Sequence, residues 1–325
     1  MNRTVWAWVR PAAAAATLAV VVWRLGAGPF QDGARAVDGQ ALAAAAGIGA
    51  LTTVCCAWRW TIVARGLGVD LPLRTAVAAY YRSVFLNLTL PGGVVGDVHR
   101  GVSHGRDAGN VGRGLRAVAW ERAAGQAVQI LLTAVVLLAL PSPVQPSTPL
   151  AAVAVVAAVI GIALASRPRT GGRRSRWARV RSAVAGDVRD VLLAPKALPA
   201  IALASALVVL GHAVTFLIAA RTAGATAPAS RMLPLAMLAM LAMVLPSVAG
   251  YGPREGGTAW AFAAAGLGAE QGAATAVVYG VMVLVASLPG ALVLAAAWLP
   301  RARRPRRPDS PLPCRAAVVD GAADG

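Results

Sequence analysis

Ionisable side chains follow glycine-rich breaks at two places in an otherwise apolar chain. Residues 90–100 are Leu-Pro-Gly-Gly-Val-Val-Gly-Asp-Val-His-Arg, and residues 245–256 are Leu-Pro-Ser-Val-Ala-Gly-Tyr-Gly-Pro-Arg-Glu-Gly. A broken helix presents unpaired backbone N–H groups at a positive dipole end. Arginine adds a planar guanidinium that suits two-point binding of phosphate or carboxylate. The breaks are therefore candidate sites for an anionic ligand.

A Glu-Arg pair at Glu121 and Arg122 adds charge between the two breaks. Carboxylates can pair with the arginines, which lowers the cost of placing charge in a low-dielectric cavity, where each unpaired charge costs ~3 kcal/mol or more. A second interpretation is that the Glu-Arg pairs are interfacial ion pairs that fix helix ends, and both interpretations stay open. The predicted site residues are Asp97, Arg100, Glu121, Arg122, Arg254, Glu255, Pro91, Gly92, Gly93, Gly96, Pro246, Gly250 and Gly252.

The composition predicts that these breaks lie in a membrane. The chain is 58% hydrophobic and only 14% charged, which is not typical of a soluble domain. A bilayer requires apolar runs of ~20 residues. Runs of about that length cover 5–23, 41–63, 117–140, 149–166, 197–220 and 272–298. The sequence therefore predicts an all-α membrane helix bundle with about six full spans and two broken or re-entrant segments, at 76–90 and 232–268.

Tryptophans near the ends of these runs, such as Trp58, Trp60 and Trp120, fit an aromatic belt at the membrane surfaces. Irregular backbone with charged side chains is tolerated inside a bilayer only where it lines a cavity or is buried in protein. The two breaks are therefore expected to frame a cavity within the bundle.

Basic residues set the expected orientation. The net charge is +18, and arginines concentrate at 100–122, 167–196 and 301–307. The positive-inside rule places the 167–196 loop and both termini in the cytoplasm, while the uncharged linker 141–148 suits the outer face. Arginines just past a membrane helix favour anionic lipid headgroups over nucleic acid. We expect one membrane domain over 1–300 and a basic, then disordered, tail over 301–325.

The charge distribution also constrains how often each broken segment crosses the membrane, which we call charge parity: two segments on the same side must be separated by an even number of crossings. With the N-terminus inside, the segment from 76 to 96 must enter the membrane and turn back, and 232–268 must contribute an even number of crossings. The second segment is then either a re-entrant hairpin or a pair of spans. Fold-backs entered from opposite sides are the arrangement of an inverted repeat. The internal sequence similarity is weak, so the repeat is a hypothesis.

Three motifs in order carry a family resemblance: residues 80–93 with Gly96, Asp97 and Arg100; then Glu121-Arg122; then 245–256. Together they resemble the lysylphosphatidylglycerol synthase transmembrane region, the flippase-like domain of the multiple peptide resistance factor group, over about 10–298. The resemblance implies a lipid flippase in the inner membrane. It also implies a substrate among anionic or aminoacylated phospholipids and polyprenyl-phosphate lipids. The soluble synthase domain of the larger members has no room in this chain, so we expect no synthase activity.

Enzyme classes find little support in the residues. The chain has no Gly-x-x-x-x-Gly-Lys-Ser/Thr phosphate loop. His99 and His104 could hold a metal, but a position in a solvated loop is the simpler interpretation. His212 is more simply interpreted as a hydrogen-bonded contact between helices. We therefore predict a transporter that is not an enzyme and uses no cofactor or metal. The alternative is a membrane glycosyltransferase-like or accessory protein in lipid-linked glycan or cell-envelope assembly.

Expected partners are membrane lipids with anionic headgroups and a separate lipid-modifying enzyme, but no nucleic acid. An oligomer is compatible with the sequence.

Overall fold

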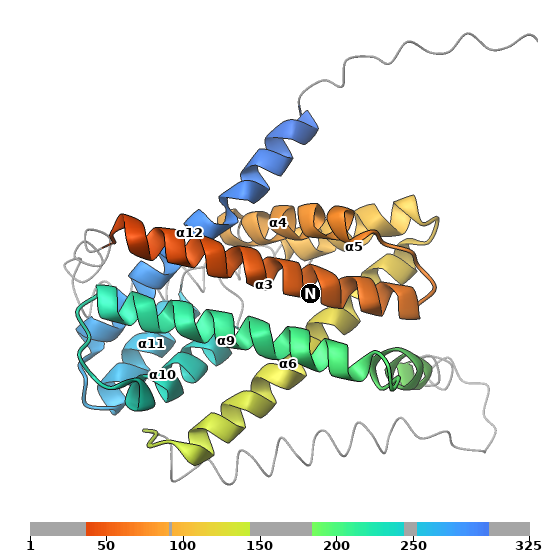
Figure 1. Cartoon of the computed structure of the whole chain (residues 1–325). Coiled ribbons are helices and arrows are strands. Elements are labelled where there is room, and N and C mark those ends of the chain that lie inside the picture. Colours follow the sequence, from red (N-terminus) through yellow and green to blue (C-terminus); the bar gives the residue numbers. More distant parts are fainter. Residues whose placement is uncertain (1–36, 91–92, 144–183, 244–251, 299–325) are drawn as a thin grey trace, which may run out of the picture.

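The computed structural model describes residues 37–90, 93–143, 184–243 and 252–298, and every regular element in that part of the chain is helical (Figure 1). The predicted spans 5–23 and 149–166 and the tail lie outside the described residues. The elements are α3 (Gly39–Gly66), α4 (Leu73–Thr89), α5 (Val95–Asp107), α6 (Val111–Ala139), the π-helical turn η1 (Val188–Leu192), α9 (Leu198–Thr222), α10 (Ala229–Ala242), α11 (Pro253–Ala264) and α12 (Ala269–Trp298).

Four of the predicted spans correspond to long helices. α3, α6, α9 and α12 are long and apolar enough to cross a membrane. Large apolar side chains remain exposed on them, for example Leu210 at 59% and Leu292 at 71%, as expected for surfaces that face lipid tails. α6 begins earlier than the predicted span because Asn110 caps it: the side-chain oxygen accepts a hydrogen bond from Arg113 N at 3.0 Å. The protein is a multi-pass helical membrane protein.

Each predicted break joins a pair of shorter helices. α4 packs on α5 across the first break, and α10 packs on α11 across the second. At 1.5 Å per residue, the 14 residues of α10 span about 21 Å and the 12 of α11 about 18 Å, which is less than the ~30 Å hydrocarbon core. These lengths favour a re-entrant hairpin over two full spans for 232–268.

The described helices repeat. α11 and α12 begin 158 residues after α5 and α6, at Pro253 against Val95 and at Ala269 against Val111. The packing repeats as well: α5 lies on α6 as α11 lies on α12, α4 contacts α12 as α10 contacts α6, and α3 crosses α9. Figure 1 shows α3 and α9 running in opposite directions, as α6 and α12 do. This is the inverted arrangement that charge parity indicated, with α3–α6 as the first half and α9–α12 as the second.

A close contact recurs at the same position of each half. Gly114 in α6 and Gly272 in α12 are 158 residues apart and face the preceding hairpin helix. An added Cβ would lie 2.6 Å from Gly105 N at the first position and 2.7 Å from Thr258 O at the second. Both hairpins are therefore held against their long helices by glycine, as close helix approach in a membrane requires.

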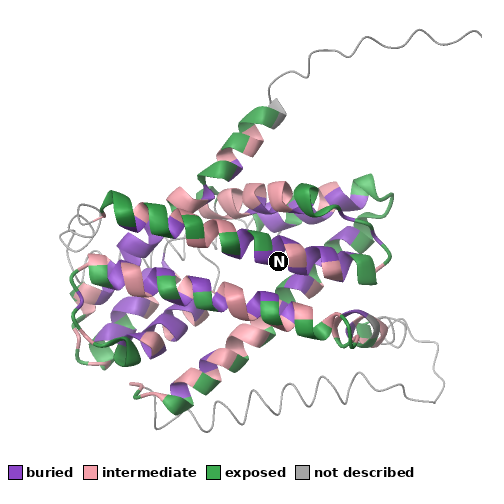
Figure 2. Ribbon diagram, viewed as in Figure 1, coloured by how far each residue is buried: buried purple, intermediate pink, exposed green. Residues whose placement is uncertain are grey.

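The apolar core is divided between the halves. One cluster joins α9 to α12 around Phe216, Phe262 and Tyr279, and a second joins α3, α4 and α6 around Trp60 and Tyr80. Figure 2 shows buried residues on the inner faces of the bundle, whereas the end of α12 projects from it with mostly exposed and intermediate residues. α3 contributes to both clusters and so lies at the junction of the halves.

Candidate functional site

A fully buried glutamate joins two arginines in the first half. Glu121 on α6 is 0% exposed, and its Oε1 accepts hydrogen bonds from Arg59 Nε at 3.0 Å and from Arg59 Nη2. Its Oε2 accepts from Arg100 Nη2 at 3.0 Å. Breaking such a pair would leave an uncompensated charge in a low-dielectric interior. Glu121 therefore ties α3 and α5 to α6.

Asp97 forms the second centre of the same network. Its Oδ1 accepts from Ser83 Oγ at 3.1 Å and from Arg100 Nη2 at 3.0 Å. Its Oδ2 accepts from Asn87 Nδ2 at 2.9 Å and is paired with Arg122 Nη2. Asp97 is the third residue of α5, where a carboxylate also favours the positive helix end. Two carboxylates and three arginines thus form one connected ion network.

A glycine explains why the first break approaches α4 so closely. Gly96 N donates to Asn87 Oδ1 at 2.7 Å, which caps the start of α5 from the neighbouring helix. A Cβ at Gly96 would collide with the backbone carbonyl of Ser83. Gly93, in the turn before α5, has φ 64°, a left-handed conformation that glycine adopts without strain. The glycines of this break thus permit the approach on which Asp97 depends.

Two aromatic rings lie against the Arg100 guanidinium. Its guanidinium carbon lies 4.4 Å from the centre of the Trp60 ring and 4.3 Å from that of Tyr80, which stabilises a desolvated cation. Trp60 is fully buried, so its prediction as part of the aromatic belt was wrong: its ring serves the network instead. His104 also packs edge-on against Trp60, with centroids 5.3 Å apart.

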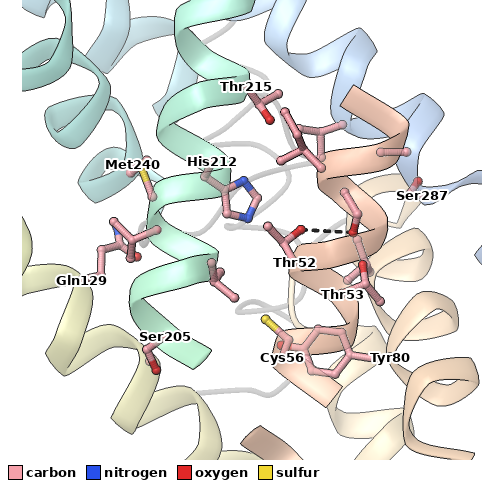
Figure 3. Close-up of a pocket in the computed structure, with 18 of the residues that line it drawn as sticks. Thr52, Thr53, Cys56, Tyr80, Gln129, Ser205, His212, Thr215, Met240 and Ser287 are labelled. Carbon is pink, nitrogen blue, oxygen red and sulfur yellow. Dashed lines mark hydrogen bonds between the residues drawn. The ribbon is translucent and has the colours of Figure 1, made fainter. Parts of the chain in front are cut away.

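A cavity of about 250 Å³ lies beside this network, between the two halves. Three network members form part of its wall, Arg59, Asp97 and Arg122, while Glu121 and Arg100 stand behind them. Figure 3 shows Thr52, Thr53, Cys56 and Tyr80 on one side of the space and Ser205, His212 and Thr215 on α9 across it. Other lining residues are Ile48, Gln126, Gln129, Val209, Met240, Met282 and Ser287. The cavity is thus polar and charged near α5 and more apolar near α10.

The charged residues of the second hairpin do not line this cavity, although Met240 of α10 does. Glu255 is 0% exposed; its Oε1 accepts from Arg254 Nε at 2.9 Å and its Oε2 from Gly252 N at 2.7 Å. Gly252 has φ 111°, a conformation that glycine accommodates. The Arg254 guanidinium lies 5.9 Å from the Tyr279 ring. None of Gly252, Arg254 and Glu255 lines the 250 Å³ cavity. The structure therefore differs from the prediction that Arg254 and Glu255 share a cavity with Asp97.

The two hairpins nevertheless occupy matching positions. Glu255 is 158 residues after Asp97 and is likewise the third residue of its helix, and Tyr279 is 158 residues after Glu121. Tyr279 OH lies 2.8 Å from His212 Nδ1, and His212 lines the cavity. His212 is thus the predicted helix contact, but it also faces the space between the halves. At these positions the second half has the Arg254–Glu255 ion pair and the His212–Tyr279 hydrogen bond.

Several predicted residues fall elsewhere. Pro91, Gly92, Pro246 and Gly250 lie outside the described residues. His99 and His104 belong to the helix α5 rather than to a solvated loop, and His104 is buried. No cluster of three or more His, Cys, Asp and Glu suited to a metal occurs among the described residues.

Sequence reasoning missed Arg59, which is central to the site. Its signal was present, because a charged residue inside a predicted span is by itself a functional candidate. Ser83 and Asn87 were also missed as Asp97 ligands, although both belong to the first motif. Ser205 accepts a hydrogen bond from Arg59 Nη1 at 2.9 Å, and nothing in the sequence singles it out.

Re-entrant half-length helices that meet long spans around a charged internal cavity define a class of membrane proteins with a midplane binding site. A family model described as the lysylphosphatidylglycerol synthase TM region matches residues 7–302. The chain belongs to this family, as the ordered motifs indicated. A comparison with curated proteins gives no significant match.

Proposed function

We propose that this protein moves a lipid with an anionic headgroup across the membrane, with the headgroup passing through the cavity between the two halves while the acyl chains stay in the bilayer. One observation carries the proposal: a cavity inside a membrane bundle is lined at one end by Arg59, Asp97 and Arg122. Charged groups within the hydrocarbon region are costly and typically mark substrate pathways.

The size of the cavity supports a headgroup as its occupant. Pockets that enclose a whole drug-sized ligand have volumes of ~300–1,000 Å³, so about 250 Å³ accommodates a headgroup but not two acyl chains. Exposed apolar side chains on the long helices, such as Leu131 and Leu210, offer the adjoining lipid-facing surface. Family membership agrees with a role in lipid biology.

Leaflet accessibility in liposomes tests the proposal. The purified protein is reconstituted with a phosphatidylglycerol that carries a fluorophore on one acyl chain, and dithionite is added to bleach the outer leaflet. Wild type is expected to accelerate bleaching of the inner-leaflet pool, with or without an imposed proton gradient, and Arg122→Ala to slow it. The control is Arg116→Ala, because Arg116 lies on the same helix but pairs with Asp187 outside the cavity.

Two results would contradict the transport role. The first is a wild-type protein that moves none of the lipids tested under either condition. The second is mass spectrometry of the liposome lipids that shows a chemically altered product, which would favour the glycosyltransferase-like alternative. We propose transport without chemical change of the lipid, so lipid masses are expected to stay constant.

The proposed setting is the plasma membrane, with both termini on the cytoplasmic side. The arginines of 167–196 and 301–307 support this orientation through the positive-inside rule. A green fluorescent protein fused after residue 325 is expected to fluoresce, and alkaline phosphatase at the same position to be inactive. Active phosphatase there would overturn the orientation.

A further inference from the structure

The ion network contains more positive than negative charge. Its cations are Arg59, Arg100 and Arg122, and its anions are Asp97 and Glu121. No other carboxylate among the described residues pairs with these arginines. The network, as it stands in the described residues, therefore has one uncompensated positive charge.

The excess charge faces the cavity. The Arg122 side chain is 52% exposed and lines the cavity, whereas the Arg100 side chain is fully buried behind it. Arg59 also lines the cavity, although its Nε and Nη2 are used by Glu121. A net charge beside a low-dielectric space is stabilised by an anion bound there. Arg122 is thus the cation best placed to meet a ligand phosphate.

The carboxylates are not available to a second cation. Both oxygens of Asp97 and both oxygens of Glu121 already accept hydrogen bonds from the protein. An ammonium group on a headgroup would meet the like charge of Arg122, and the one carboxylate in the cavity wall, Asp97, is already paired with Arg100 and Arg122. The cavity wall therefore disfavours aminoacylated and ethanolamine headgroups.

Neutral hydrogen-bonding groups complete the lining. Gln126 Nε2 is buried and has no hydrogen-bond partner among the described residues, and Gln126 lines the cavity with Thr53 and Gln129. A buried amide N–H without a partner costs free energy that a ligand oxygen can recover. Headgroup hydroxyls are the chemical group that suits these side chains.

We infer that this cavity selects a headgroup whose phosphate is its only charged group and whose other polar atoms are hydroxyls, and that it rejects headgroups with an ammonium. The inference rests on the proposed function, since it names the substrate class of that cavity. The shared chemistry occurs in two lipid sources, glycerol phosphodiesters such as phosphatidylglycerol and polyprenyl-linked sugar phosphates.

Binding, measured apart from transport, tests the inference. Delipidated wild type in detergent is titrated with phosphatidylglycerol, a polyprenyl-phosphate sugar, phosphatidylethanolamine and lysylphosphatidylglycerol, and bound lipid is measured by native mass spectrometry. One of the two hydroxylated phosphates is expected to bind at least roughly tenfold more tightly than both ammonium lipids. The lipid that binds more tightly, phosphatidylglycerol or the polyprenyl-phosphate sugar, identifies which of the two lipid sources the cavity selects.

Variants locate the selection in the cavity wall. Arg122→Gln is expected to remove most of the preference for the phosphate, and Gln126→Leu to weaken phosphatidylglycerol while leaving phosphatidic acid unchanged. Arg116→Gln, on the same helix but outside the cavity, should match wild type.

Equal or tighter wild-type binding of lysylphosphatidylglycerol or phosphatidylethanolamine would overturn the inference, whether or not any variant folds. Lipid movement in liposomes would in that case still support the transport proposal. Selective binding without movement would leave the inference intact and remove the transport role.

Discussion

Replacing Glu121 by glutamine tests whether the ion network holds the first half together. Glutamine keeps the shape of the side chain but removes the charge that Arg59 and Arg100 share. Three hydrogen bonds from guanidinium groups end on Glu121. The change also leaves Asp97 as the one carboxylate of the network, opposite three arginines.

The expected loss of stability is large. A hydrogen bond to a charged group contributes about 1.5–3 kcal/mol, and removing one partner of a buried ion pair costs about 3–5 kcal/mol. The contributions overlap because the same carboxylate makes them all. We therefore expect Glu121→Gln to destabilise the protein by about 3–5 kcal/mol, which corresponds to a fall in Tm of at least roughly 5 °C.

Thermal unfolding in one detergent, followed by size-exclusion fluorescence, measures this effect. The matched control is Asp70→Asn, because Asp70 is exposed and its nearest Arg65 nitrogen is 3.9 Å away; such surface pairs contribute little. A double variant, Arg59→Gln with Glu121→Gln, should lose less than the sum of the single variants by about 1 kcal/mol or more. A Tm for Glu121→Gln within 1–2 °C (about the measurement error) of wild type would refute the reasoning.

Substitutions at three further positions, with one control position, probe the packing around the site. Gly96→Ala is expected to cost about 1–3 kcal/mol or to abolish folded yield, because its Cβ meets a backbone carbonyl. Gly47→Ala in α3 has open space around the added Cβ and should be neutral or stabilising by up to ~1 kcal/mol. Equal melting temperatures for the two variants would contradict this expectation. Tyr80→Phe should change Tm little because the hydrogen bond from Tyr80 OH to Glu121 is long at 3.4 Å. Tyr80→Leu should lower Tm because it removes the ring that contacts the Arg100 guanidinium. Equal Tm values for the two variants would argue against the cation–π contact. Tyr279→Phe is expected to cost about 1 kcal/mol by leaving His212 Nδ1 without its hydroxyl partner, and an unchanged unfolding curve would rule that contact out as stabilising.

The sequence was informative where local chemistry determines structure. Clustered glycine and proline disfavour a continuous helix, so the residues at 90–100 and 245–256 marked both hairpins, whereas the single prolines Pro234 and Pro289 lie inside helices. Apolar runs of sufficient length located four of the spans because a bilayer sets their length. Asp97, Arg100, Glu121 and Arg122 were singled out because charge in an apolar chain requires a reason.

The remaining features depend on how the helices pack. Arg59 meets Glu121 across 62 residues because α3 and α6 lie together, and no spacing in the sequence encodes that contact. Arg254 and Glu255 resemble the first site in composition, but Glu255 turns back to cap its own helix and pairs with its sequence neighbour. Similar residues at matching positions therefore acquired different surroundings from tertiary structure.

The location of the ion pairs has a mechanical consequence. The ion pairs of the Asp97–Glu121 network lie within α3–α6, and the network reaches the second half through one described hydrogen bond, from Arg59 to Ser205. A hydrogen bond to a hydroxyl is exchanged for water or a lipid oxygen at little cost. The first half can therefore rock as a rigid body against the second half without breaking an ion pair of the network. The energetic barrier to such a motion would come from the packing of α3 and α4 against α9 and α12, not from electrostatics.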